Sequence, residues 1–335
     1  MRGLLKRNEF YVSLTILALC FLIQSKSGQF FTGNNLIDLA RSMIIPGILC
    51  MGVLIEIISG GIDVSFPAIA MLSMFSTVKL LLYVDYKGPV IVAFIIAGLI
   101  GLVLGLINGG LIAFLKLPTL IITLGTGSIY LGFMQAVLKS RVISVLPEPI
   151  SKLSKSYLFT AHNKELGISS SLPSVFILLI VTVVLVYFIL NRTMLGRGIY
   201  ALGGDIIACE RAGFNVARLQ YFIYGFMGGL AGVAGMTRTV LTGSCQPTTL
   251  IGFELTCIAA VILGGTRITG GHGTVKGALL GALLITMVSN SLILLGVPTY
   301  WSKFVTGIII IIGTGASAYQ ILRQKRKLNA SVFED

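Results

Sequence analysis

Long stretches without a charged residue are the feature that most restricts what this chain can fold into. The runs Val90–Leu115, Ser174–Leu190 and Ala278–Val297 contain no Asp, Glu, Lys or Arg. Each approaches the roughly 20 apolar residues that a helix needs to cross a bilayer. Only 11% of all residues are charged, against about 25% in soluble domains, and the mean hydropathy is +0.96. The chain is therefore predicted to be an all-α polytopic membrane protein.

The apolar segments predict about ten transmembrane helices, with the N- and C-termini both in the cytoplasm. Arg2, Lys6 and Arg7 precede the first apolar segment, which is typical of an uncleaved first span with its N-terminus inside. The segment 252–265 is short for a crossing, so it is expected to be a short span or a re-entrant element. The predicted spans are residues 10–26, 43–59, 66–84, 90–114, 121–138, 173–190, 219–240, 252–265, 275–295 and 301–321.

The net charge of +13 is explained by the positions of the basic residues. They lie in short loops and in the tail 322–335, where Lys and Arg determine membrane topology. The arginine-rich loop 191–218 is predicted to be cytoplasmic, whereas the longer loop 139–171, which is also basic, is predicted to be an external surface. Nucleic-acid binding would require a clustered basic face on a soluble domain. Residues 1–335 are therefore expected to form one transmembrane domain.

The arginine-rich loop contains a short segment with the signals of a capped helix. Gly203-Gly204 is expected to form a flexible approach, and Asp205 can accept a hydrogen bond from the first turn of a helix over residues 206–212. Gly213 fits the left-handed position that ends a helix. A capped helix between two spans suits docking against a soluble partner. An ordinary solvated connector fits the same residues equally well.

Two breaks after apolar runs begin with paired glycines, at residues 60–65 (GGIDVS) and 264–271 (GGTRITGG). Broken membrane segments free backbone groups that protein or water must satisfy, so both breaks are candidates for lining a pathway. Two turns at the membrane edge are the alternative. Glu56, Asp63 and Glu254 lie in or beside predicted spans, where an ionisable side chain normally faces a cavity or a partner. Asp63 and Glu254 also fit local roles at helix N-termini.

Glycines recur every four residues in three of the predicted spans. Small residues at this spacing let helices approach closely in lipid, so we interpret these glycines as packing residues. The five cysteines show no pair with metal or redox spacing and are interpreted as structural. The glycines concerned are Gly101, Gly105, Gly109, Gly225, Gly228, Gly229, Gly232, Gly277 and Gly281.

No motif supports an enzyme, a resident cofactor or a metal site. The chain has no GxxxxGK[ST] sequence for ATP, no HExxH and no GxSxG. His162 and His272 are isolated from each other and from the cysteines. If the protein transports a solute actively, the energy must therefore come from an ion gradient or from a separate ATPase.

Four blocks of sequence, in order along essentially the whole chain, resemble the ribose-type permeases of ABC transporters. The first two blocks are SGGIDVSFPAIAML (59–72), which is similar to the family's GGIDLS signature, and NGGLIAFLKLPTLIITLGTGSIYLG (108–132). The later two are GRGIYALGGDIIACERAGFNVARLQYFIYGFMGGLAGVAG (196–235) and ELTCIAAVILGGTRITGGHGTVKGALLGALL (254–284). Four ordered blocks are far more specific than any one of them.

This resemblance implies a membrane subunit of a bacterial importer for pentoses, hexoses or related small polyols, in the cytoplasmic (inner) membrane. Its implied partners are a second copy or a sibling permease, an ATP-binding subunit with two fused nucleotide-binding halves, and an extracytoplasmic sugar-binding protein received by loop 139–171. The implied ATPase contacts are Gly203, Gly204, Asp205, Glu210, Arg211 and Gly213. The implied pathway residues are Asp63, Ser65, Phe66, Asn108, Thr123, Thr126 and Glu254.

The chain departs from the family pattern at two places. Residues 66–68 (FPA) follow GGIDVS where the family has small residues, and Arg267 stands where a small polar residue is usual. These changes suggest a subgroup that need not carry ribose itself, with an autoinducer-2-like molecule as an open alternative. Two other functions fit less well. They are a branched-chain amino-acid permease and an ion-coupled secondary transporter in which Glu56 and Asp63 would bind ions.

Overall fold

The computed structural model of this chain describes residues 8–163 and 167–298 together with single positions beyond them. Those positions are Trp301, Phe304, Val305, Gly307, Ile308, Ile311 and Gly315. The predicted span 301–321 as a whole, the basic tail 322–335 and the basic residues before Asn8 lie outside the described residues.

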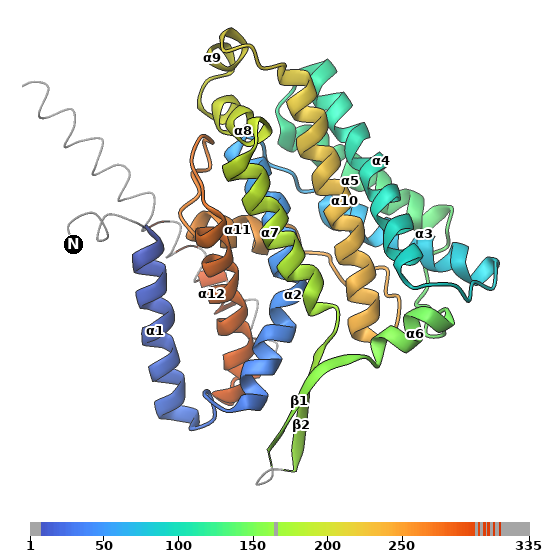
Figure 1. The fold of residues 1–335 in the computed structure, drawn as a ribbon, viewed down its shortest axis with the longest axis vertical. Helices are drawn as coiled ribbons and strands as arrows, with labels where there is room; N and C mark the ends of the chain where they lie inside the picture. Colours follow the sequence, from blue (N-terminus) through green and yellow to red (C-terminus); the bar gives the residue numbers. More distant parts are fainter. Residues whose placement is uncertain are drawn as a thin grey trace, which may run out of the picture.

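The described chain is mostly helical, in the arrangement that Figure 1 shows. Its elements are α1 (Asn8–Ser27), α2 (Gly33–Ile58), α3 (Phe66–Tyr83), α4 (Ile91–Leu115), α5 (Thr119–Ala136), α6 (Glu148–Ser154), β1 (Tyr157–Asn163), β2 (Ile168–Pro173), α7 (Phe176–Arg192), α8 (Met194–Gly204), α9 (Ile206–Arg211), α10 (Val216–Thr242), α11 (Phe253–Leu263) and α12 (Val275–Leu294). Among the described residues, six helices (α1 to α5 and α12) are long and apolar enough to cross a membrane. The pair α7 and α8, bent by 74°, makes a seventh when the two helices are counted as one span. A helical polytopic membrane protein is thereby confirmed.

Helix α2 begins earlier than the hydropathy pattern predicts, at Gly33 rather than at residue 43. Thr32 caps it, because its hydroxyl accepts a hydrogen bond from the Asn35 N–H at 3.4 Å. The first turns carry polar side chains such as Asn35 and Asp38. They lower the average hydropathy of this stretch, so the hydropathy pattern predicts a loop there. Polar residues are compatible with a helix end outside the bilayer core, so the expected external connection over 27–42 is mostly helix.

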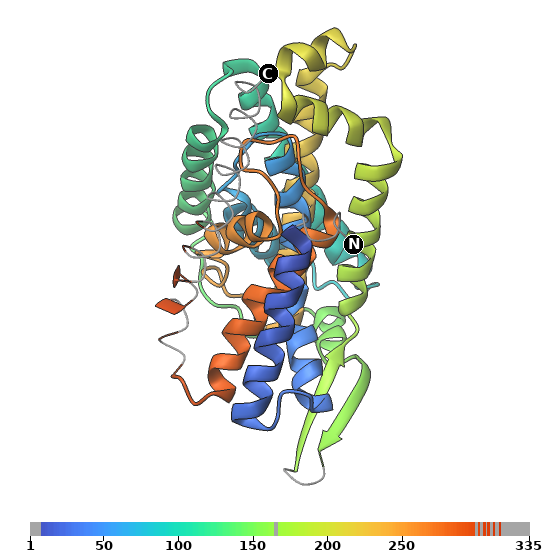
Figure 2. The ribbon, with the colours of Figure 1, turned by 90° about the vertical axis from the view of Figure 1, so that its left-hand side faces the viewer.

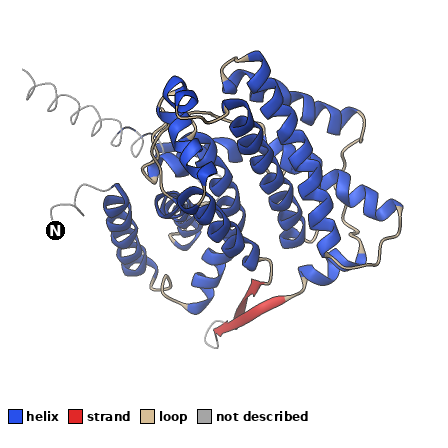
Figure 3. Ribbon diagram, turned by 45° about the horizontal axis from the view of Figure 1, so that its top comes forward, coloured by secondary structure: helices blue, strands red, loops and turns tan. Residues whose placement is uncertain are grey.

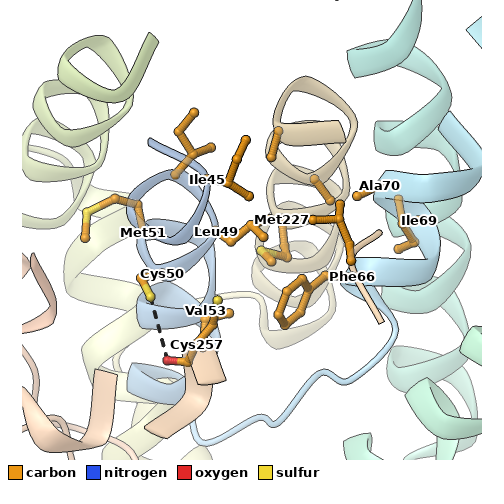
Figure 4. Packing of buried hydrophobic residues seen from close by; sticks show 14 of the residues in the cluster. Ile45, Leu49, Cys50, Met51, Val53, Phe66, Ile69, Ala70, Met227 and Cys257 are labelled. Atoms are coloured by element: carbon orange, nitrogen blue, oxygen red, sulfur yellow. Dashed lines mark hydrogen bonds between the residues drawn. The ribbon is translucent and has the colours of Figure 1, made fainter. Parts of the chain in front are cut away.

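Helix α2 is also the centre of the fold. Every residue from Gly47 to Ile58 is buried, because α7, α10, α11 and α12 all pack against this helix. Figure 4 shows Leu49 of α2 on the side of Met227 from α10 and of Phe66 at the start of α3. A side chain in this stretch of α2 is therefore surrounded by protein and has no access to water.

Helices α4 and α10 lie side by side, as Figure 1 shows, and glycines bring their backbones together. A Cβ atom at Gly101 or Gly105 would collide with the backbone of α10, and one at Gly228 or Gly232 would collide with the backbone of α4. Gly281 of α12 approaches the backbone of α11 in the same way. The interpretation of these glycines as packing residues is confirmed.

Residues 139–171 contain the short helix α6 and most of a two-stranded hairpin, which departs from the all-helical expectation. Strands β1 and β2 pair antiparallel, with Phe159 opposite Leu172, and Figure 3 shows them in red. The Ser170 hydroxyl donates to the Asp38 carboxylate at 3.0 Å, which ties β2 to the first turns of α2. Figures 1 and 2 both show the hairpin at one end of the molecule and α9 at the other.

The close approach of α4 and α10 gives a stability test. Gly228→Ala is expected to lower the free energy of unfolding by about 1–3 kcal/mol, the usual effect of overpacking, because the added methyl group meets the Gly101 carbonyl. Gly132→Ala on α5 is the matched control, because its Cβ meets nothing within 4 Å. Thermal unfolding in detergent should show a lower Tm for Gly228→Ala alone, and equal Tm values for the two variants would contradict the packing.

Candidate functional site

Gly60 and Gly61 form the turn that breaks the chain after α2. The Gly60 N–H donates to the Ile57 carbonyl and the Gly61 N–H donates to the Glu56 carbonyl, both at 3.0 Å. Gly60 has φ +83°, the left-handed conformation that this type of helix ending requires. The sequence GG after an apolar run therefore ends α2 sharply, and the chain continues without regular secondary structure to α3.

The non-helical segment after the glycines is fixed by hydrogen bonds to α5. The Ile62 N–H donates to the Thr119 hydroxyl at 2.9 Å, and the Val64 N–H donates to the Thr123 hydroxyl at 3.3 Å. Gly127 lets the next turn of α5 approach, because a Cβ there would lie only 3.3 Å from a backbone atom of the break. Non-helical backbone inside a membrane persists only where protein or water satisfies it, and these threonines provide acceptors.

A chain of buried polar side chains runs from the break to α4 and α5. The Asp63 carboxylate accepts from the Ser65 N–H at 2.6 Å and from the Ser65 hydroxyl at 2.7 Å. The Asn108 amide donates to the Ser65 hydroxyl at 2.7 Å. The Tyr130 hydroxyl lies 3.1 Å from the Asn108 carbonyl oxygen and 3.0 Å from the Leu104 backbone carbonyl, so it can donate to either. We call Asp63, Ser65, Asn108 and Tyr130 the polar chain.

Glu56 lies next to this chain without being part of it. Its side chain is fully buried, and neither carboxylate oxygen has a hydrogen-bond partner among the described residues. The ionisable side chains that it faces are Asp63 and Tyr224. Neither Glu56 nor Asp63 forms a salt bridge with a described residue. Tyr224 closes the site from α10, because its hydroxyl packs directly on Gly61.

Four of the predicted pathway residues (Asp63, Ser65, Asn108, Thr123) meet here, and the other three lie elsewhere. Thr126 is buried one turn along α5 and donates to the Thr123 carbonyl at 3.4 Å. Phe66 is fully buried and packs into the apolar core. Glu254 lies at the start of α11, where its carboxylate accepts from the Gly252 N–H at 3.1 Å.

The structure adds three residues that the sequence analysis missed, Thr119, Tyr130 and Tyr224. Tyr130 follows Thr123 by seven residues and so shares its helix face, which is a signal that periodicity could have supplied. Thr119 opens α5 directly after Pro118 and gives no comparable signal. Tyr224 comes from α10, and only the packing of α10 against α2 brings it to the break.

Helix α9 has the capped geometry that the sequence predicts. The Asp205 carboxylate accepts from the Ala208 N–H at 2.9 Å, and Gly213 has φ +85°. Ile206 and Ile207 are 56% and 61% exposed, so this short helix presents apolar side chains outward. Glu210 and Arg211 are exposed beside them.

Gly203 and Gly204 differ from the flexible approach that was expected. Both are helical and end α8, an element that the sequence analysis did not predict, which Thr193 caps by accepting from the Gly196 N–H at 3.2 Å. Gly204 is exposed, and a Cβ there would meet nothing within 4 Å. Gly203 instead faces the protein, with its backbone against the Ile58 carbonyl at the end of α2.

The described residues contain no group of three or more His, Cys, Asp or Glu side chains that could hold a metal ion. The five cysteines are all free thiols. In α9, burial and, to a smaller extent, the charge of Glu210 raise the pKa of the Cys209 thiol. Cys209 therefore stays protonated, as a structural cysteine does.

Comparison with known proteins gives a consistent result. The family model described as "Branched-chain amino acid transport system / permease component" matches residues 35–313. The ribose import permease of Haemophilus influenzae is 30% identical over 95% of this chain and 94% of its own length. The ribose import permease of Bacillus subtilis is 34% identical over 92% of both chains. The autoinducer 2 import system permease protein of Photorhabdus luminescens is 29% identical over 93% of this chain and 90% of its own length.

No solved structure matches the chain. The family match begins in the first turn of α2 and extends beyond α12, so it includes the break, the polar chain and helices α8 and α9. Together with the apolar helices, it makes the chain a multi-pass inner-membrane protein that takes part in transport as a non-catalytic subunit. The chain belongs to the family of permease subunits of ABC import systems.

Proposed function

We propose that this chain forms the pathway through which a sugar crosses the membrane in a binding-protein-dependent ABC importer. The substrate is a pentose, a hexose or a related small polyol, with an autoinducer-2-like molecule as the alternative. Relatives named as ribose and autoinducer 2 permeases support this substrate class. Their identities to this chain are similar, so they do not choose between the two.

The observation that carries the proposal is the polar chain at the α2–α3 break. Its groups are a carboxylate, two hydroxyls and an amide, which together can donate to and accept from the hydroxyl groups of a sugar. In the described state these groups bond to one another, which would close the proposed pathway at this level. Passage of a sugar would exchange these internal hydrogen bonds for bonds to its hydroxyls.

The ATP-binding subunit docks on the exposed surface around α9. Its proposed contacts are Asp205, Ile206, Ile207, Glu210, Arg211 and Gly213. Exposed apolar side chains flanked by charged ones are suited to a protein interface with an apolar centre and a polar rim. Gly203 faces the interior, and Gly204 ends α8 and so lies before α9 and its cap; we therefore leave both out of this surface.

In the membrane, α9 faces the cytoplasm, because the loop that contains it is rich in arginine. The hairpin β1–β2 lies at the opposite end of the molecule and receives the extracytoplasmic binding protein. A tenth span over 301–321 returns the chain to the cytoplasm, so that both termini and the tail 322–335 lie inside. A second copy or a sibling permease completes the pathway.

In the transport cycle, the ATP-binding subunit closes on ATP and tilts α9, and the pathway changes from inward-open to outward-open. ATP can drive this change only because the closed ATP-binding subunit binds one of the two states more tightly. The docked binding protein then releases its sugar into a pathway of low affinity. The permease supplies no catalytic group and needs no cofactor.

The two other functions are not favoured. The description of the family model names branched-chain amino acids, but the named relatives that align over nearly the whole chain carry ribose or autoinducer 2. An ion-coupled transporter would use Glu56 and Asp63 as an ion site. The capped and exposed helix α9 would have no role in such a transporter.

Ile207→Asp is expected to release the ATP-binding subunit. A carboxylate on the apolar centre of the interface should weaken binding by about tenfold or more. We would purify the permease in mild detergent with its ATP-binding subunit and measure how much of that subunit is retained. Undiminished retention by the variant contradicts the docking surface. A wild-type permease that retains no ATP-binding subunit, and whose uptake of labelled ribose into vesicles follows an ion gradient, contradicts the ABC assignment.

Phe159→Asp on the hairpin is expected to have the complementary effect. Phe159 is exposed at the proposed external end, so a charge there should weaken docking of the binding protein by about tenfold. The measurement is the affinity of purified binding protein for the reconstituted importer. Ser128→Ala serves as the control, because Ser128 is exposed on α5, outside the hairpin, and the change should leave this affinity unchanged. If Phe159→Asp releases the ATP-binding subunit instead, the proposed orientation is wrong.

Asn108→Leu is expected to block transport without releasing either partner. The change leaves the Ser65 hydroxyl without its donor, at a cost of about 1–3 kcal/mol, and removes a group that sugar hydroxyls would contact. Uptake of labelled ribose driven by ATP should fall by at least about tenfold. Ser128→Ala is the matched control, because Ser128 is exposed on α5 and bonds only within its own helix. Equal uptake by the two variants would remove the polar chain from the pathway.

A further inference from the structure

Three segments that are far apart in the sequence meet backbone to backbone between α9 and the break. The Gly271 N–H donates to the Ile58 carbonyl at 2.8 Å. A Cβ at Gly203 would collide with the same Ile58 carbonyl and lie 2.6 Å from the Gly271 nitrogen. A Cβ at Gly270 would lie 2.7 Å from the Gly203 carbonyl and 2.9 Å from the Gly60 Cα. We call these five residues the glycine junction.

The glycines of this junction are needed for two different reasons. Gly60, Gly270 and Gly271 have φ values of +83°, +86° and +72°, so their backbone conformation itself favours glycine. Gly203 is helical, and glycine is needed there only because no space exists for a Cβ. A substitution at Gly203 therefore changes the contact between segments without straining its own backbone.

The junction is connected to α9 on one side. Gly203 and Gly204 end α8, and Asp205 follows directly as the cap of α9. The Cys209 thiol of α9 lies 3.8 Å from the Gly198 carbonyl of α8, so the two helices also pack against each other. A displacement of α9 is therefore passed to α8 as one packed unit.

On the other side, the junction is connected to the pathway. Ile58 is the last residue of α2, and Gly60 and Gly61 form the turn that leads to the polar chain. The loop that carries Gly270 and Gly271 is held to α8 as well, because the Tyr200 hydroxyl donates to the Gly273 carbonyl at 2.8 Å. Backbone contacts leave no side chain that could absorb a displacement by changing its rotamer.

We propose that Gly203 couples the ATP-binding subunit to the pathway. Its missing side chain lets α8 lie directly on the end of α2, so that a displacement of α9 moves the break at residues 59–65. This role rests on the proposed function, because it requires a partner that moves α9. Gly203 is a positioning residue, which contacts neither the ATP-binding subunit nor the sugar.

The test is hydrogen exchange of the peptide 59–65 in the assembled importer of permease, ATP-binding subunit and binding protein. Exchange is compared between the nucleotide-free complex and the complex trapped with ATP and vanadate, which needs no knowledge of the sugar. In the wild type, trapping is expected to change exchange of this peptide by about tenfold, a typical size for coupling between distant sites. In Gly203→Ala this change should be lost, while the ATP-binding subunit is still retained and still hydrolyses ATP.

Gly204→Ala is the matched control. It is the next residue of the same helix, the change brings the same gain of about 1 kcal/mol in helix propensity, and its Cβ meets nothing. It should keep the wild-type response to trapping. A wild-type response in Gly203→Ala as well would overturn the proposal.

If Gly203→Ala does not accumulate in the membrane, Tyr200→Phe decides the question. It removes the hydrogen bond to the Gly273 carbonyl and adds no atoms, so the response to trapping should shrink severalfold. An unchanged response in Tyr200→Phe would overturn the proposal. A wild-type permease that retains no ATP-binding subunit would contradict the proposed function itself, and the coupling role would fall with it. The two failures are therefore distinguishable.

Discussion

Backbone groups that a broken membrane helix leaves unpaired are the constraint on which the rest of this structure depends. Ending α2 within the bundle leaves its last carbonyls, and the N–H groups of the non-helical residues that follow, without helical partners, and each unpaired group would cost several kcal/mol in lipid. The N–H groups of Gly60 and Gly61 donate to carbonyls in the last turn of α2. The hydroxyls of Thr119 and Thr123 accept hydrogen bonds from N–H groups of the segment that follows. The Asp63 carboxylate accepts a hydrogen bond from the N–H group of Ser65. These bonds fix α2, α3 and α5 relative to one another and place the polar chain at their centre.

The molecule has a rigid part and a part that can change conformation, and the two parts are held together by different kinds of contact. Helices α4 and α10 are joined by glycines whose backbones are in direct contact, with no room for a side chain between them. The break is instead held by side-chain hydrogen bonds, each with a net contribution of about 0.5–1.5 kcal/mol. Hydroxyl groups of a sugar, or water, can replace such bonds at little cost. Movement during transport is therefore expected to concentrate at the break and not at the α4–α10 contact.

The sequence was informative where local chemistry decides the structure. Asp205 and Gly213 predicted the ends of α9 correctly, because caps depend on neighbouring residues alone. The glycine spacing also predicted the close helix contacts, because small residues four apart lie on one face of a helix and let another helix approach. Three features could not be predicted: the early start of α2, the hairpin, and the approach of Tyr224 to the break. The polar first turns of α2 have a low average hydropathy, so hydropathy alone predicts a loop there. Tertiary contacts, such as that between Ser170 and Asp38 or that of Tyr224 with the break, leave no periodic pattern in the sequence.

Glu56 is a buried acidic side chain that lowers the stability of the fold at this site. It lies in the stretch of α2 that protein surrounds completely, and its carboxylate has no hydrogen-bond partner among the described residues. Another acid, Asp63, lies beside it. Stability alone would favour an apolar residue here, because a buried ionisable group without a partner destabilises a protein by several kcal/mol. The Glu56 carbonyl accepts from the Gly61 N–H, so this side chain lies at the turn where α2 ends. If the proposed pathway opens at this break, water or a sugar hydroxyl would supply the hydrogen-bond partner that the Glu56 carboxylate lacks among the described residues.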